Sequence, residues 1–225
     1  MALKWFNLCL IIFFSFGFFF NAKSSKKIKI YKTKEEIILD GKLDELFWSN
    51  SEVATNFFQQ FPNDSIQSTL ITEVRLAFTD KRIYLSAKMY DSVPERYIVN
   101  SLKRDYSGPN NEAIAFTFDT YNDQKNAFNF GVNPYGVQRE SLIAKGGALL
   151  SPGVFNISWN SRWESYVKKY DDYWIVELSV PFRSIRYNSE NRVWGFNVGR
   201  NNLAKSEWSN WTALPKGYFP YNLSY

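Results

Sequence analysis

Ala113-Ile-Ala-Phe-Thr-Phe118 and Asn126-Ala-Phe-Asn-Phe-Gly-Val132, on either side of Asp119-Thr-Tyr-Asn-Asp123, form the stretch of sequence that decides the fold. In both flanking segments apolar side chains alternate with small or polar ones, the period of two expected for β-strands with one buried face. The five residues between them are of types that favour tight turns. This stretch therefore predicts an antiparallel hairpin.

Segments with the same alternation occur on both sides of this hairpin, at fairly regular intervals and with turn residues between them. Helical periodicity is almost absent, and only residues 43–48 and 182–185 look helical. About eight to ten strands spaced in this way predict an all-β fold, an antiparallel two-sheet β-sandwich with short helical turns only. The further expected strands are 73–78, 83–90, 137–143, 163–169, 174–180, 193–199 and 207–213.

The composition excludes several kinds of catalysis. The 225 residues include 27 Lys and Arg against 22 Asp and Glu, no His, and a single cysteine, Cys9. Without His there can be no Ser-His-Asp or Cys-His machinery and no His-bound zinc. Without a second Cys there can be no disulfide within the chain. An active site would have to use carboxylates, Lys, Tyr or hydroxyl groups.

The N-terminus has the layout of a secretory signal peptide, which we expect at residues 1–22. Lys4 precedes an apolar run from Leu8 to Phe20, and polar and basic residues follow at once. The run, roughly 13 residues, is short for a helix that crosses a membrane, and a retained signal anchor is the alternative. We expect a basic linker at 23–36 and one domain at 37–225, which is not an integral membrane domain once the signal is removed. Export argues against nucleic acid as a partner.

Several strings of the sequence, taken together in their order and spacing, carry a resemblance to a known family. They are Leu39-Asp-Gly-Lys-Leu-Asp-Glu-Leu-Phe-Trp48, Thr72-Glu-Val-Arg-Leu76, Ile83-Tyr-Leu85, Lys103-Arg-Asp105, Phe118-Asp-Thr-Tyr-Asn-Asp123, Phe130-Gly-Val-Asn-Pro-Tyr-Gly-Val-Gln-Arg139, Trp159-Asn-Ser-Arg-Trp-Glu164, Trp174-Ile-Val-Glu-Leu178, Pro181-Phe182 and Trp194-Gly-Phe-Asn197. They resemble the N-terminal domain of large exported bacterial proteins, in which a sandwich similar to family 9 carbohydrate-binding modules precedes a C-terminal outer-membrane β-barrel.

This resemblance implies where the protein acts and with what. It implies a periplasmic, outer-membrane or cell-surface location in a Gram-negative bacterium, a glycan or oligosaccharide as the ligand, and an association with glycan breakdown or uptake. Chains of that family continue for several hundred residues, whereas this one ends at Tyr225. We therefore expect the barrel to be absent, and the chain to be a fragment, a truncated gene product or a free-standing sandwich. An outer-membrane barrel stays a candidate partner.

Sugar binding requires aromatic faces that stack on pyranose rings and planar polar groups that bond to hydroxyls in pairs. The candidates for stacking are Trp159, Trp163, Trp208, Trp211 and Tyr121, and the candidates for polar contacts are Arg104, Asp105, Asn133 and Arg139. Each tryptophan has an alternative place in the sandwich core, and Arg104 with Asp105 could form a local ion pair that closes a loop.

One departure from the family pattern favours a second function. In characterised family 9 modules two tryptophans enclose the sugar, and the first stands just before the strand that matches 113–119. This sequence has Ser107-Gly-Pro-Asn-Asn111 there and no Trp. The alternative to sugar binding is therefore an interaction or structural sandwich that packs on a barrel or another partner.

Metal binding and catalysis have weaker signals. Asp119, Asn122 and Asp123 place oxygens in one hairpin, and they either form a weak Ca²⁺ site or cap a tight turn. A glycosidase needs two carboxylates about 5 to 9 Å apart across a cleft, and no spacing singles out a pair, so we expect a non-catalytic module. The carboxylates available are Glu112, Asp119, Glu140, Glu164 and Glu177, of which Glu177 is expected to point to solvent.

Overall fold

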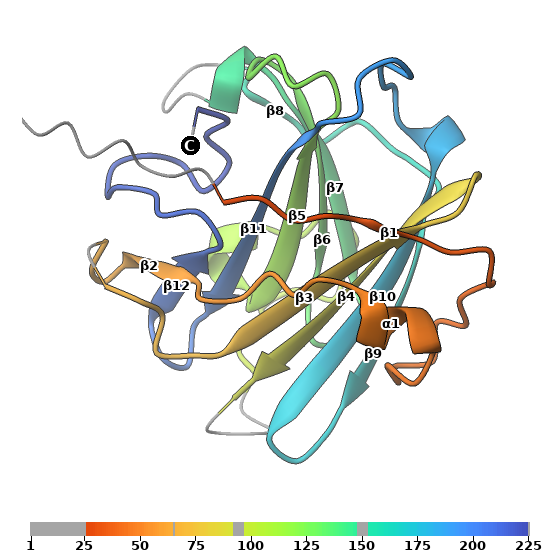
Figure 1. The fold of residues 1–225 in the computed structure, drawn as a ribbon. Helices are drawn as coiled ribbons and strands as arrows, with labels where there is room; N and C mark the ends of the chain where they lie inside the picture. The colour runs from red at the N-terminus through yellow and green to blue at the C-terminus, as the bar shows by residue number, and fades with distance from the viewer. Residues whose placement is uncertain (1–25, 65, 92–96, 148–152, 225) are drawn as a thin grey trace, which may run out of the picture.

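The computed structural model describes residues 26–64, 66–91, 97–147 and 153–224, which form two β-sheets packed face to face (Figure 1). The five-stranded sheet has the order β1 (Tyr31–Lys32), β3 (Thr72–Phe78), β4 (Arg82–Tyr90), β10 (Tyr173–Pro181) and β9 (Glu164–Lys169). The seven-stranded sheet has the order β2 (Phe58–Phe61), β12 (Glu207–Asn210), β11 (Gly195–Asn202), β5 (Ala113–Asp119), β6 (Ala127–Val132), β7 (Gln138–Ile143) and β8 (Phe155–Asn156).

Neighbouring strands are antiparallel except β1 and β3, which are parallel, so the predicted antiparallel two-sheet sandwich is confirmed. The hairpin predicted at 113–132 is β5 and β6, with Phe116 opposite Phe130. The last predicted strand is shorter than expected, because β12 ends at Asn210. The helical elements of the described chain are short, namely α1 (Leu46–Asn50), η1 (Gly108–Asn110), η2 (Lys145–Gly147) and η3 (Phe182–Ser184).

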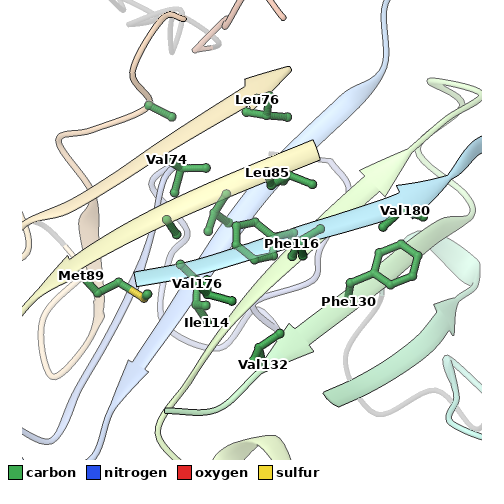
Figure 2. Close-up of a cluster of buried hydrophobic side chains, with 14 of the residues drawn as sticks. Val74, Leu76, Leu85, Met89, Ile114, Phe116, Phe130, Val132, Val176 and Val180 are labelled. Atoms are coloured by element: carbon green, nitrogen blue, oxygen red, sulfur yellow. The ribbon is translucent and has the colours of Figure 1, made fainter. Parts of the chain in front are cut away.

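The core lies between the two sheets and is built from the inward-facing side chains of both (Figure 2). Val74, Leu85 and Val176 of the five-stranded sheet and Ile114 and Phe116 of the seven-stranded sheet have no exposed surface. Burying one such side chain stabilises the fold by about 1.5 to 3 kcal/mol. The alternation read from the sequence thus corresponds to the inner and outer faces of each strand.

The outer face of the five-stranded sheet is covered by the chain segment 37–50. Phe47 and Trp48 are buried there against Ala77 and Tyr84, and α1 lies over the sheet in Figure 1. This cover is apolar, so it closes one side of the sandwich by the same hydrophobic effect that forms the core.

Glu177 lies beneath this covering segment, so the expectation that it points to solvent is wrong. Its side chain has no exposed surface, and Oε2 accepts the N–H groups of Gly41 at 2.7 Å and Asp40 at 3.1 Å. Gly41 has φ +76°, and a Cβ there would lie 2.3 Å from the Cβ of Lys168, so only glycine fits the turn that covers Glu177. Burial of the carboxyl raises the pKa of Glu177 to about 7.

The predicted N-terminal segments fall partly outside the described residues. The expected signal peptide at 1–22 lies outside them, as do residues 23–25. The rest of the expected linker contributes to the fold, because Tyr31 of β1 pairs with Ala77 and the Lys26 Nζ donates a hydrogen bond to the Asn56 carbonyl at 2.6 Å. Within the part of the chain that the structure describes, no helix is long and apolar enough to cross a membrane.

Candidate functional site

The outer face of the seven-stranded sheet carries a shallow trough. Strand pairing places Asn210, Gly199, Ala115, Gly131 and Arg139 in one row across β12, β11, β5, β6 and β7. Because the three central residues have no side chain beyond Cβ, the row is low in its middle and higher at its ends. We call this row of five residues the trough.

A row of hydroxyl and amide side chains runs beside the trough. It consists of Asn197, Thr117, Asn129 and Ser141, each opposite the next in neighbouring strands. The Asn129 Nδ2 donates a hydrogen bond to the Thr117 Oγ1 at 2.9 Å, which fixes the amide. This row therefore offers uncharged donors and acceptors, which suit hydroxyl groups.

Two aromatic side chains line the same small cavity over the trough. Tyr106 is buried and comes from the loop before β5, and Trp208 is half-buried on β12. Trp208 lies opposite Asn201 of β11, whose Nδ2 donates to the Asn111 carbonyl at 2.9 Å and so ties that loop to the sheet. Burial raises the pKa of Tyr106 well above its usual range, so its hydroxyl keeps its proton.

Several buried polar atoms on this face have no hydrogen-bond partner within the described chain. They are the Tyr106 hydroxyl, the Trp208 Nε1, the Arg139 Nε, the Ser141 Oγ and the Asn210 Oδ1. A buried donor or acceptor without a partner costs about 1 to 3 kcal/mol. Three of these atoms, on Tyr106, Trp208 and Arg139, belong to residues that line the cavity, and unpartnered polar groups at a cavity are what a site for a polar ligand requires.

The C-terminal segment 219–223, which we call the cover, closes this face. Tyr221 packs against Ala127 and Ile143, and its ring centroid lies 5.1 Å from that of Phe155 in β8. The Leu223 N–H donates to the Gly146 carbonyl at 3.0 Å. The cavity left beneath Pro220 and Tyr221 has a volume of about 20 Å³, which is enough for about one water molecule.

The model of the family described as Carbohydrate family 9 binding domain-like matches residues 38–219. The chain belongs to this family. The resemblance to family 9 carbohydrate-binding modules is thereby confirmed, and the matched domain belongs to a family of binding modules and not of catalytic domains. No curated protein matches the chain.

Solved structures share the fold of this family 9 domain. Two are of a carbohydrate-binding module family 9 from Caldicellulosiruptor kristjanssonii, in complex with cellotriose (TM-score 0.54, 16% identity, 80% of this chain and 81% of that chain) and with glucose (TM-score 0.53, 17% identity, 80% and 83%). A third is a protein from Bacteroides uniformis ATCC 8492 described as carbohydrate-binding (TM-score 0.59, 12% identity, 79% and 85%). At these identities the likeness concerns the fold.

The structure places only two of the predicted sugar-binding residues of this family 9 domain at the trough. Trp208 and Arg139 line its cavity. Tyr121 is exposed in the hairpin after β5. Asn133 is fully buried, and its Oδ1 accepts the N–H groups of Tyr135 and Val137 at 2.9 and 3.0 Å, so it shapes a turn.

The three other tryptophans named for stacking pack in the core of the family 9 domain. Trp163 and Trp211 are 6% and 4% exposed, and Trp159 is half-buried, with its ring centroid 5.3 Å from that of Phe128. These rings belong to the core between the two sheets or pack against it, whereas Tyr106 and Trp208 line the cavity on the outer face. Their placement favours the alternative that they anchor the sandwich.

The acidic hairpin is held by its own backbone. Asp119 is buried, and its two carboxylate oxygens accept the N–H groups of Asp123 at 3.2 Å and Gln124 at 2.7 Å, while Asn122 has φ +53°. Among the described residues no group of three His, Cys, Asp or Glu could hold a metal ion. This geometry favours the turn-capping alternative over a Ca²⁺ site.

Tyr106 is the site residue that sequence reasoning missed. The family pattern has a Trp just before the strand at 113–119, residues 107–111 contain none, and Tyr106 stands one position earlier. A second signal was present in the outward positions of the strands. Ala115, Gly131 and Gly199 are small where a solvent-facing strand position usually carries a long polar side chain.

Proposed function

We propose that this family 9 domain binds a glycan, or the end of a glycan chain, in the trough between Tyr106 and Trp208. The observation that carries the proposal is the pair of aromatic residues at one cavity whose buried polar atoms have no partner in the described chain. Aromatic rings stack on the C–H faces of a pyranose, and the Arg139 fork and the Asn129 amide would bond to its hydroxyls. The solved family 9 modules bound to cellotriose and glucose support this ligand class.

The proposal requires the cover to move. The cavity of about 20 Å³ is far smaller than the roughly 300 Å³ or more of a typical ligand pocket. A sugar ring would take the place of Pro220 and Tyr221, and the apolar contacts of Tyr221 with Ala127 and Ile143 would be exchanged for sugar contacts.

The setting we propose for this binding is the outer envelope of a Gram-negative bacterium, where the exported chain would assist glycan breakdown or uptake. The layout of residues 1–22 and the resemblance to barrel-bearing exported proteins support it. Expression of the tagged chain in a Gram-negative host tests it. A shortened protein in the periplasmic or outer-membrane fraction is expected, and an uncleaved protein in the cytoplasm would contradict it.

Calorimetry of the purified protein with cellotriose and glucose tests the binding itself. We expect saturable binding that Trp208→Ala and Tyr106→Ala each weaken at least about tenfold, since stacking is worth about 1 to 3 kcal/mol per ring. Tyr166→Ala is the matched control, because Tyr166 is exposed on β9 of the opposite sheet. Equal binding by all four proteins would contradict the proposal.

A second candidate function is the interaction module that packs on a barrel or another partner without sugar binding. The observation that favours it is the cover, which already occupies the trough in the described chain. The same titrations separate the two functions. A folded protein that binds neither sugar, even when Tyr221→Ala removes the main contact of the cover, would establish the second.

A further inference from the structure

A second hollow lies at the end of the sandwich where β4 begins and β10 ends. It opens to solvent and has a volume of about 600 Å³, within the range of roughly 300 to 1,000 Å³ that small-molecule sites occupy. We call it the arginine pocket, because its lining includes Arg82, Arg104, Arg162 and Arg183, with Asn160 and Ser161 between them.

Ordered strand ends bring these arginines together from distant parts of the sequence. Arg82 is the first residue of β4 and pairs with Pro181, the last of β10. Arg183 follows in η3, which is tied to the β3–β4 hairpin by a hydrogen bond from the Phe182 N–H to the Lys81 carbonyl at 2.9 Å. Figure 1 shows η3 beside that hairpin. The positions of Arg82 and Arg183 are therefore set by the sheet.

A buried carboxylate fixes the other side of the pocket. Glu140 of β7 has no exposed surface, and its Oε1 accepts hydrogen bonds from the Arg104 guanidinium at 2.6 Å and the Ser161 N–H at 3.3 Å. Its Oε2 accepts the Trp163 Nε1–H at 3.3 Å. One carboxylate thus holds both Arg104 and the loop that carries Asn160, Ser161 and Arg162.

The pocket retains positive charge after these pairs are counted. Arg104 is paired with Glu140, and Arg82 is paired with Glu164 at 2.9 Å. Arg162 and Arg183 are exposed, and within the described residues their guanidinium groups form no hydrogen bond or ion pair. Two unpaired cations at a concave surface attract anions more strongly than the same cations on a flat one.

The choice of cation indicates what kind of anion fits. Four of the ten arginines in the chain line this pocket, and no lysine lies among its described lining residues. Arginine offers a planar fork that bonds to carboxylate, sulfate or phosphate oxygens in pairs, whereas lysine offers a point charge. A pocket whose lining cations are all arginines favours a ligand whose oxyanion is held in a defined orientation.

We propose that the arginine pocket binds the carboxylate or sulfate group of an acidic sugar, with Arg162 and Arg183 as its direct partners. The proposal rests on the proposed glycan-binding function, which supplies the sugar ring to which the anion is attached. The volume accommodates the ring as well as its charged group, and the Asn160 amide and Ser161 hydroxyl lie in the same lining to contact its hydroxyls.

Titration of the purified protein with methyl glucoside, glucuronate and glucose 6-sulfate tests this. The three probes share a pyranose ring and carry a hydroxymethyl group, a carboxylate or a sulfate ester at its sixth carbon, and methyl glucoside also carries a methyl group on its anomeric oxygen. The two charged arms separate a carboxylate from a sulfate. We expect at least one charged sugar to bind about tenfold or more tightly than methyl glucoside, as charge-assisted hydrogen bonds predict. The double variant Arg162→Gln, Arg183→Gln should abolish that preference.

The matched control is the double variant Arg186→Gln, Arg192→Gln, which removes the same charge at exposed positions outside the pocket. It should keep the preference. Equal loss in both double variants, or no preference in the unmodified protein, would overturn the proposal. If inorganic sulfate binds as tightly as glucose 6-sulfate, the pocket recognises the anion without the sugar ring, and the claim that it binds an acidic sugar is overturned.

The outcome also separates this proposal from the proposed function. Cellotriose binding that Trp208→Ala removes, without a preference for charged sugars, would overturn the arginine pocket alone. Charged sugars that require Arg162 and Arg183, without cellotriose binding, would overturn the trough alone.

Discussion

The trough and the arginine pocket lie on opposite sides of one strand and differ in almost every property. The trough is floored by small residues, lined by aromatic and amide groups, and closed to about 20 Å³. The arginine pocket is open, measures about 600 Å³ and is lined by four guanidinium groups. Arg139 and Glu140 are neighbours on β7, yet Arg139 lines the trough and Glu140 anchors the pocket, because successive side chains of a strand point to opposite faces.

This difference teaches how one sandwich can present two surfaces of opposite chemistry. The trough has a single cation, Arg139, in its cavity lining, and the uncharged donors and acceptors beside it suit hydroxyl groups. Cations in the pocket suit an anion and would be costly to bury without one. Because the residues of the trough and those of the arginine pocket share only β7, a substitution in one hollow should leave the other intact.

The largest expected effect tests that independence directly. Glu140→Ala should lower the free energy of unfolding by about 3 kcal/mol, since it leaves Arg104 and the buried indole of Trp163 without their acceptor. Urea unfolding measures this, with Glu164→Ala as the control, because its exposed pair with Arg82 is worth about 1 kcal/mol or less. Cellotriose affinity should not change. A parallel loss of cellotriose binding would show that the two hollows are one unit.

A smaller effect lies in the five-stranded sheet, away from both hollows. The pKa of Glu177 is raised by burial to about 7 from an ordinary value of 4.5, so the folded protein binds its proton more tightly than the unfolded chain does. The contribution of Glu177 to stability should therefore be greatest below about pH 4.5 and fall by about 2 kcal/mol as the pH rises to about 6.

Glu177→Gln should remove that pH dependence and leave the protein more stable than the unmodified one at pH 8. The Gln oxygen can still accept the N–H groups of Asp40 and Gly41, so the two proteins should be equally stable near pH 4. Denaturant unfolding at a series of pH values measures the difference. Two parallel stability curves would show that Glu177 titrates normally under its cover.

The smallest effect separates the covered hollow from the open one. Tyr221→Ala removes the ring that packs on Ala127 and Ile143 and should raise cellotriose affinity about tenfold, or about 1.4 kcal/mol, because the sugar displaces a weaker competitor. Glucuronate affinity should stay the same. Calorimetry measures the affinity for both sugars. An equal increase in affinity for cellotriose and glucuronate would contradict the assignment of the cover to the trough.

The sequence allows the strands to be predicted because their alternation is local. It also places Glu177 correctly on the outer face of its strand. Whether that face meets water depends on Gly41 and its neighbours, more than 130 residues away, and no local pattern reports such a contact.

The tryptophans show the same limit. Trp208 faces the trough, while Trp211, three positions further along, lies in the core beside Val198 of β11, whose carbonyl accepts the Trp211 N–H. Successive side chains of an extended chain alternate between faces, so the spacing places the two rings on opposite faces. Which of them faces inward depends on the register with β11, and a shift of one residue would exchange them.

The cover also has a consequence for how binding would be controlled. The cover is part of the same chain, so it competes with the sugar at a fixed local concentration. The observed dissociation constant for the sugar therefore equals the intrinsic one divided by the fraction of molecules in which the cover has left the trough. If about one molecule in a hundred is open, affinity is reduced about a hundredfold. A protein that bound residues 219–223 and held the cover open would restore this hundredfold loss of sugar affinity. By linkage, bound sugar would increase the affinity of that protein for residues 219–223 by the same factor.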